Sequence, residues 1–149
     1  ADLLVAGIGQ HQRLEQGMRA CRITEPVLSQ DGQPALHVAS VLSLTEGEAN
    51  VFWPVYNAYQ SDMVTHYDRL MKLIETYSGA YDTMTDQTAS KILADYLALE
   101  KDHVALLTSY VPRFEKVLPA KKVARLYQIE NKLRALVNYE LARQIPFVK

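Results

Sequence analysis

Apolar residues recur at steps of three and four from about residue 46 onward, and polar residues fill the positions between them. This spacing is typical of α-helices that turn one face toward a core. The first stretch predicts a helix over about 46–80, with a packed face of Trp53, Tyr56, Met63, Tyr67, Leu70, Ile74 and Tyr77. The second predicts a helix over about 86–118, with Ile92, Tyr96, Leu99, His103, Leu106, Tyr110, Phe114 and Val117. The third predicts a helix over about 120–143, with Val123, Leu126, Ile129, Leu133, Leu136 and Val137.

Local signals mark where these helices begin. Thr45-Glu46-Gly47-Glu48 has the spacing of a capping box, in which the threonine hydroxyl and the glutamate carboxylate bond each other's backbone amides. Thr83 or Thr85 is expected to cap the second helix, and Pro119 suits the first turn of the third. Because only a few residues join the first two helices, an antiparallel hairpin is expected. The fold class is therefore predicted to be all-α.

Two prolines fall inside predicted helices. Pro54 and Pro112 each lie 29 residues from a turn centred near residue 83, so they are expected at the same level of the hairpin. A proline inside a helix removes one hydrogen bond and bends the axis. The prediction is a long, bent hairpin.

The first 44 residues are expected to form an N-terminal segment of loop and short helices. Residues 11–22 are compatible with a helix, 26–34 with a loop, and 35–42 with one or two helical turns. Residues 45–149 are expected to form the helical hairpin domain, with one domain overall.

Charge is distributed unevenly along the chain. The net charge is −1, yet residues 1–100 hold 6 Lys and Arg against 13 Asp and Glu, and residues 101–149 hold 10 against 4. The basic third predicts a surface that attracts acidic or unfolded polypeptide, with Phe147 as an apolar contact. The candidate residues are Lys116, Lys121, Lys122, Arg125, Tyr127, Lys132 and Arg134. The alternative is a solvated helix face that complements its acidic neighbours.

Catalytic and cofactor motifs are not recognised in the sequence. There is no Gly-rich phosphate loop, His-Glu-x-x-His pair, Cys-x-x-Cys or nucleophile elbow, so neither an enzyme nor a cofactor is expected. Nucleic-acid binding is not expected either, because acidic residues dominate the rest of the chain. No apolar run approaches the roughly 18 residues of a membrane span. A start at Ala1 is compatible with a signal peptide cleaved on export.

One cluster offers metal-ligand chemistry. Asp62 and His66 lie four apart on the first helix, and Glu100 and His103 lie three apart on the second. Distances from the turn place Asp62 level with His103, and His66 level with Glu100. Two imidazoles and two carboxylates at one level suit zinc, nickel or cobalt. The simpler interpretation, which we favour, is that each imidazole bonds the carboxylate opposite, so no metal is expected.

Several segments resemble one family of exported helical proteins. The segments are 42–48, which reads Leu-Ser-Leu-Thr-Glu-Gly-Glu, and 52–56, 96–100, 117–122, 128–133, 139–142 and 145–146. Residues 42–148 resemble the Spy/CpxP-like periplasmic proteins, whose helices start with a Leu-Thr-x-x-Gln motif. This chain has Glu48 where the motif has glutamine, and Leu118-Pro119 lacks the threonine expected at a second helix start.

The resemblance implies a periplasmic protein, commonly a dimer whose bent hairpins form a cradle. Its relatives are chaperones, stress-sensor inhibitors and metal sensors. We therefore expect a chaperone-like or envelope-stress binding protein that holds polypeptide on a concave, partly basic surface. The alternatives are a divalent-metal sensor or resistance protein, and a purely structural role. A homodimer is also expected, because three one-sided helices leave apolar flanks that one copy does not cover.

Overall fold

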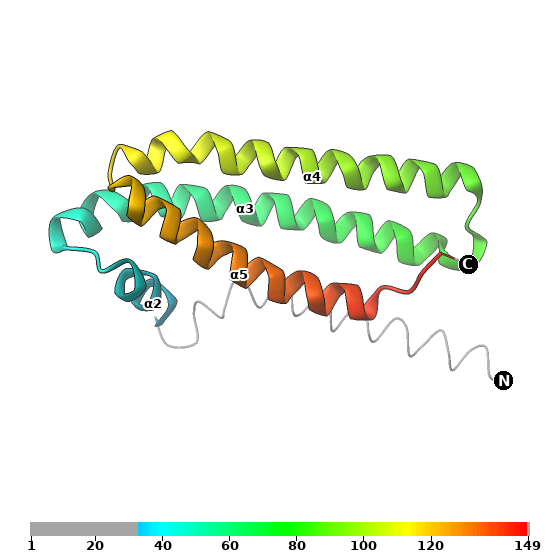
Figure 1. Ribbon diagram of the computed structural model, residues 1–149. Coiled ribbons are helices and arrows are strands. Elements are labelled where there is room, and N and C mark those ends of the chain that lie inside the picture. Colours follow the sequence, from blue (N-terminus) through cyan, green and yellow to red (C-terminus); the bar gives the residue numbers. More distant parts are fainter. Residues whose placement is uncertain (1–32, 149) are drawn as a thin grey trace.

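The computed structural model describes residues 33–148, and within this range the chain is all-α. Its elements are α2 (Gln33–Leu42), α3 (Glu46–Ala80), the single 3-10 turn η1 (Tyr81–Thr83), α4 (Asp86–Glu115) and α5 (Ala120–Gln144). The long helices α3 and α4 form an antiparallel hairpin, and α5 returns along it (Figure 1). The predicted fold class is confirmed. The predictions for residues 1–32 lie outside the described residues.

The helix starts follow the local signals. Thr45 accepts a hydrogen bond from the backbone of Glu48, whose carboxylate accepts one from the backbone of Thr45, so the capping box is present. Of the two threonines considered for α4, Thr85 is the cap. The second arm ends at Glu115 rather than near residue 118. Its last turn closes early, since Pro119 disfavours helical geometry in the residue before it.

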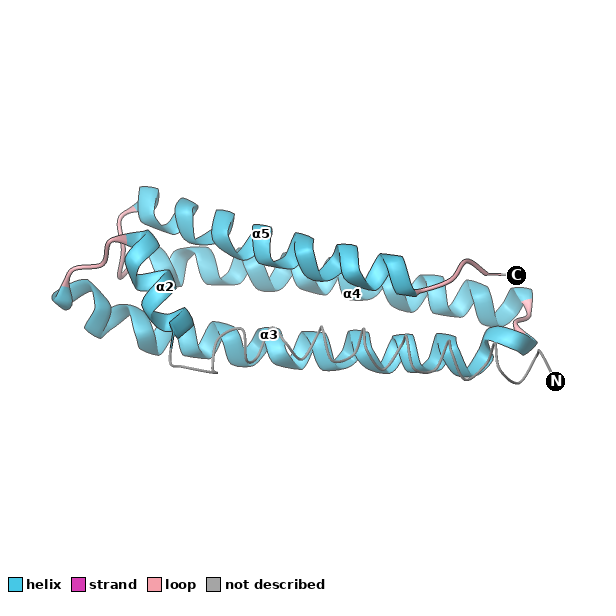
Figure 2. Cartoon of the chain, turned by 90° about the horizontal axis from the view of Figure 1, so that it is seen from below, coloured by secondary structure: helices cyan, strands magenta, loops and turns pink. Residues whose placement is uncertain are grey.

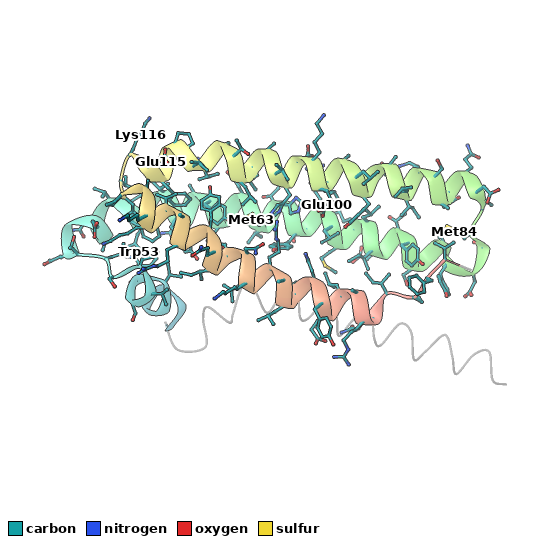
Figure 3. All side chains as sticks on the ribbon, in the orientation of Figure 1. Trp53, Met63, Met84, Glu100, Glu115 and Lys116 are labelled. Carbon is teal, nitrogen blue, oxygen red and sulfur yellow. The ribbon has the colours of Figure 1, made fainter. Side chains whose placement is uncertain are left out.

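Both internal prolines lie at the same end of the hairpin. The helices continue through Pro54 and Pro112, and α3 arcs gently over its length (Figure 1). The rings of Phe52 and Phe114, two residues from the prolines, lie 6.0 Å apart. Figure 3 shows Glu115 and Lys116 at this end and Met84 at the other.

The short helix α2 packs against α5 at the end where α3 and α5 begin (Figure 2). It ends at Leu42 and is followed by Ser43, whose φ of 50° is left-handed. The amides of Ser43 and Leu44 bond the carbonyls of Ser40 and Ala39, which is the pattern of a Schellman C-cap. The chain therefore reverses sharply between α2 and α3.

The core consists of two apolar clusters. The larger lies at the proline end and includes Phe52, Tyr59, Tyr110, Phe114 and Leu126. The smaller lies toward the turn and is built around Ile74 and Leu141. Between Met63 of the first cluster and Ile74 of the second, the buried position on α3 is His66. A polar layer therefore separates the two apolar clusters.

Two residues predicted on packed faces are exposed. Tyr96 of α4 and Leu136 of α5 are both open to solvent, so their predicted burial is wrong. Both lie in the half of the bundle where the core is smaller.

Candidate binding surface on α5 and the buried polar layer

Four of the seven predicted binding residues make contacts within the fold, and one of these four, Arg125, is also exposed on the surface of α5. Lys122 donates to Glu48 Oε2 at 2.6 Å and to the carbonyl of Ser43 at 2.8 Å. Arg125 donates to the carbonyl of Val41 at 3.3 Å. These two side chains fasten α5 to the α2–α3 connection.

The other two of the four, Tyr127 and Arg134, face α4. The hydroxyl of Tyr127 donates to the carbonyl of Leu107 at 2.6 Å. The ring of Tyr127 stands edge-on to Phe114, at 6.2 Å. Burial raises the pKa of Tyr127 to about 12. Arg134 donates to His103 Nε2 and to Asn131. Their atoms hold α5 on the hairpin.

The three remaining candidates, Lys116, Lys121 and Lys132, are exposed. Lys116 lies at the α4–α5 connection, apart from the others. Lys121 and Lys132 lie on α5 and belong to a longer pattern on its surface. These two lysines were predicted from the sequence as binding residues, whereas the apolar residues beside them were not.

We call this pattern the α5 stripe: Lys121, Arg125, Lys132, Leu136, Tyr139 and Arg143. Successive members are 4, 7, 4, 3 and 4 residues apart, so at 3.6 residues per turn they fall within a sector of about 60°. All six are exposed, and Leu136 and Tyr139 are 67% and 63% exposed. The Arg143 guanidinium lies 5.8 Å from the Tyr139 ring centre, and its Nη1 lies 3.1 Å from the Glu140 carboxylate. The stripe is a basic surface with an apolar centre, about 33 Å long at 1.5 Å per residue.

The sequence contained the signal for this stripe. Leu136 was predicted for the packed face because it follows Leu133 by three residues, and Tyr139 was not considered. The packed face of α5 follows Val123, Leu126, Leu133 and Leu141, and Leu136 lies to one side of that face. When a helix has two apolar faces, periodicity alone does not show which of them is buried.

The proposed metal cluster does not assemble. Asp62 accepts a hydrogen bond from the hydroxyl of Tyr110 at 2.6 Å, rather than facing His103. His66 lies against His103, with ring centres 4.8 Å apart, rather than against Glu100. The predicted pairing of each imidazole with a carboxylate is therefore wrong. On α4, the group that His66 contacts lies three residues further from residue 83 than predicted, and the group that Asp62 contacts lies seven residues further.

A cation has a further obstacle at this layer. Arg134 donates to Nε2 of His103, one of the two ring nitrogens that can bind a metal, and its positive charge repels a divalent ion. Among residues 33–148, no group of three or more His, Cys, Asp and Glu side chains is placed to hold a metal ion.

The histidine layer is built from one residue of each long helix: His66 of α3, His103 of α4 and Arg134 of α5. Both imidazoles are buried. Burial, reinforced by Arg134 and His66, lowers the pKa of His103 to about 4. Burial and Arg69 lower the pKa of His66, and Glu100 and Asp102 partly oppose that shift. Both rings are therefore neutral at pH 7, and His103 Nε2 accepts from Arg134.

One turn earlier on α5, Glu130 forms a second polar contact with α3. Its Oε1 accepts hydrogen bonds from the Tyr56 hydroxyl at 3.0 Å and from Gln60 at 3.4 Å. Burial raises the pKa of Glu130, and the hydroxyl donors oppose that shift. Burial and the Glu130 charge raise the pKa values of Tyr56 and Tyr59. The hydroxyls therefore remain protonated and keep donating.

Three charged side chains near the helix interfaces, Arg69, Arg125 and Glu130, make separate contacts rather than one ion-pair network. Arg69 pairs with Asp102 at 2.8 Å, Arg125 with a carbonyl, and Glu130 with hydroxyl and amide donors.

No helix within residues 33–148 is long and apolar enough to cross a membrane. Comparison with known proteins found no matching family model, no matching curated protein and no matching solved structure.

Proposed function

We propose that this chain is a non-enzymatic binding protein that holds unfolded or acidic polypeptide along the α5 stripe. The observation that carries the proposal is the exposure of Leu136 and Tyr139 between Lys132 and Arg143 on one helix face. Exposed apolar side chains framed by polar ones are typical of interaction sites, and Tyr and Arg are enriched in such sites.

The charges of the stripe suit a polypeptide with acidic residues near its apolar ones. Lys121 and Lys132 have long, exposed side chains free to follow different ligands, and they raise the association rate with an acidic chain. The Tyr139 ring offers a rigid apolar surface at low entropic cost. Such a surface selects on composition rather than sequence, which suits a chaperone-like protein.

The periplasm is part of this proposal and rests on the resemblance to the Spy/CpxP-like proteins. Cell fractionation of the natural host tests it, with recovery in the periplasmic fraction as the expected result. The divalent-metal alternative is not proposed, because Arg134 lies against Nε2 of His103 and no group of three or more His, Cys, Asp and Glu side chains within residues 33–148 is placed to hold a metal ion.

The binding test uses the full chain and a reduced, carboxymethylated acidic protein that cannot refold. Fluorescence anisotropy of this labelled probe gives the dissociation constant. The variant K132E/L136S/Y139S should weaken binding at least about tenfold, since it removes both the apolar and the basic centre of the stripe. Circular dichroism should show unchanged helicity, because all three side chains are exposed.

The matched control is K72E, which makes the same single charge reversal on α3 rather than on α5. It should leave the dissociation constant within about twofold at 150 mM salt. Equal weakening in both variants would reduce the effect to net charge and overturn the stripe as the binding site. Unchanged binding in both would also overturn it.

A further inference from the structure

The two halves of α5 are held on the hairpin unequally, and the histidine layer lies between them. Before the layer, Lys122 bonds the α2–α3 connection and Leu126 belongs to the larger apolar cluster. After the layer, α5 contributes Val137 and Leu141 to the smaller cluster, near the turn of the hairpin (Figure 1). Within residues 33–148 the smaller cluster has fewer buried members than the larger one. The second half of α5 is therefore the more easily detached.

The histidine layer gathers positive charge when its imidazoles take up protons. His66 and His103 are 8% and 4% exposed, and their ring centres lie 4.8 Å apart. Arg134 of α5 donates to His103 from the other side. Protonation of the rings would place up to three positive charges in contact, away from water. Like charges repel strongly in such surroundings, and an unpaired buried charge is costly.

The charged groups around the rings come from all three long helices. Burial is the main cause that lowers the pKa of both imidazoles. Glu100 and Asp102 on α4 raise the pKa of His66, whereas Arg69 on α3 lowers it. Arg134 on α5 lowers the pKa of both rings. The compensating carboxylates thus lie on the hairpin, and the repelling cation lies on α5. Repulsion therefore acts to separate α5 from the hairpin.

Glu130, one turn before Arg134, responds to acid in the opposite sense. Burial raises the pKa of Glu130, so the docked form of this part of α5 holds a proton more readily than a solvated chain does. Falling pH therefore favours docking at Glu130. The lowered pKa values of the two imidazoles mean that falling pH disfavours docking at Arg134. The sign of the effect changes between residues 130 and 134, so the hinge belongs there.

We propose that the histidine layer is an acid-sensitive latch, which in mildly acidic solution releases residues 131–144 of α5 from the α3–α4 hairpin while the first half of α5 stays docked. Release uncovers Ile74 and Leu141. It also breaks the hydrogen bond from the Tyr77 hydroxyl to the Pro146 carbonyl, which is 2.6 Å long. The inference goes beyond the polypeptide-binding proposal and does not depend on it, because the latch needs no ligand.

Native-state hydrogen exchange of the full chain tests the latch. Protection is the exchange rate of an unstructured chain at the same pH divided by the observed rate. With a pKa of about 4 when docked and 6.5 when released, His103 alone makes release about twentyfold more favourable at pH 5 than at pH 7. Screening by solvent reduces this factor, so the protection of residues 134–144 should fall at least about fivefold.

Low concentrations of urea distinguish local release from unfolding of the whole chain. Release exposes little surface, so the protection of residues 134–144 at pH 5 should depend weakly on urea. Protection of residues 52–63 of α3 should be at least about tenfold higher and depend steeply on urea. Equal protection and equal urea dependence in both segments would mean global unfolding and overturn the latch. Protection of residues 134–144 that is the same at pH 7 and pH 5 would also overturn it.

Variants identify the groups that respond to acid. In H66Q/H103Q the protection of residues 134–144 should change by less than about twofold between pH 7 and pH 5, since glutamine does not titrate. The matched control H37Q removes a histidine of α2, outside the layer, and should keep the full wild-type fall.

A single variant on α5 keeps the test decisive if the double variant is already released at pH 7. R134Q removes the repelling cation, so His103 should gain its proton more easily while docked. The fall in protection should then be smaller than in wild type. A fall in R134Q as large as in wild type, or a full fall in a docked H66Q/H103Q, would overturn the proposal.

Discussion

At the scale of single residues, the histidine layer makes the stability of the bundle depend on pH. The pKa of His103 is near 4 in the folded chain, against an ordinary value of 6.5. As the pH falls below 6.5, the unfolded chain takes up a proton that the folded chain resists, so folding loses free energy. The loss should develop between about pH 6.5 and pH 4 and be on the order of 1–2 kcal/mol, allowing for screening by solvent.

Urea unfolding of the wild type and of H103Q from pH 7.5 to 4 measures this loss. The glutamine oxygen still accepts from Arg134 but does not titrate, so H103Q should lose less stability over this range. The comparison matters because Glu130 acts in the opposite direction. Its raised pKa makes folding bind a proton as the pH falls, which stabilises the folded chain in wild type and variant alike. Equal pH dependence in both proteins would contradict the role given to His103.

The layer also shows what sequence reasoning misses at this scale. His66 and His103 were predicted at nearly the same level of the hairpin, but each was paired with a carboxylate rather than with the other imidazole. Counting from the turn places opposing residues only approximately, because side-chain packing decides how far the arms slide. In the structure Asp62 bonds the hydroxyl of Tyr110, and His103 is bonded by Arg134 of α5 in place of Asp62.

At the scale of elements, neighbouring lysines of α5 have different roles. Lys122 bonds both Glu48 and the Ser43 carbonyl, whereas Lys121 is exposed on the stripe. Lys122 therefore links three segments: α5, the start of α3 and the end of α2. Its partner Glu48 has a pKa lowered by Lys122 and by the Thr45 backbone amide.

K122A should therefore lower the thermal midpoint by a few degrees, while K121A should change it by no more than about one degree. The two variants remove the same charge one residue apart, so net charge cannot explain a difference. Calorimetry at pH 7 measures both midpoints. An equal effect would mean that the link from Lys122 to the α2–α3 connection adds nothing to stability.

Element boundaries were predictable where the deciding contacts are local. Thr45 and Glu48 bond each other across three residues, so the start of α3 could be read from four letters. The Lys122–Glu48 pair joins residues 74 apart, and nothing in the local sequence indicates it. For the same reason, nothing in the local sequence indicates the contacts that Lys122, Arg125, Tyr127 and Arg134 make within the fold.

At the scale of the whole molecule, the basic residues of the C-terminal third divide into two groups. The residues of the first group make contacts within the fold: Lys122 pairs with Glu48, and Arg134 lies against His103. The rest is exposed along α5 beside Leu136 and Tyr139. The self-complementing interpretation therefore fits Lys122 and Arg134, and the binding surface stays a proposal for the exposed residues of α5.

The most direct test of the account is a map of backbone amide shifts when unlabelled, carboxymethylated acidic polypeptide is added to the 15N-labelled chain. The account predicts that the largest shifts fall on residues 132–143 of α5, with little change along the α3 surface around Lys72. Shifts concentrated on α3, or on α4 without α5, would contradict the claim that the α5 stripe is where polypeptide binds.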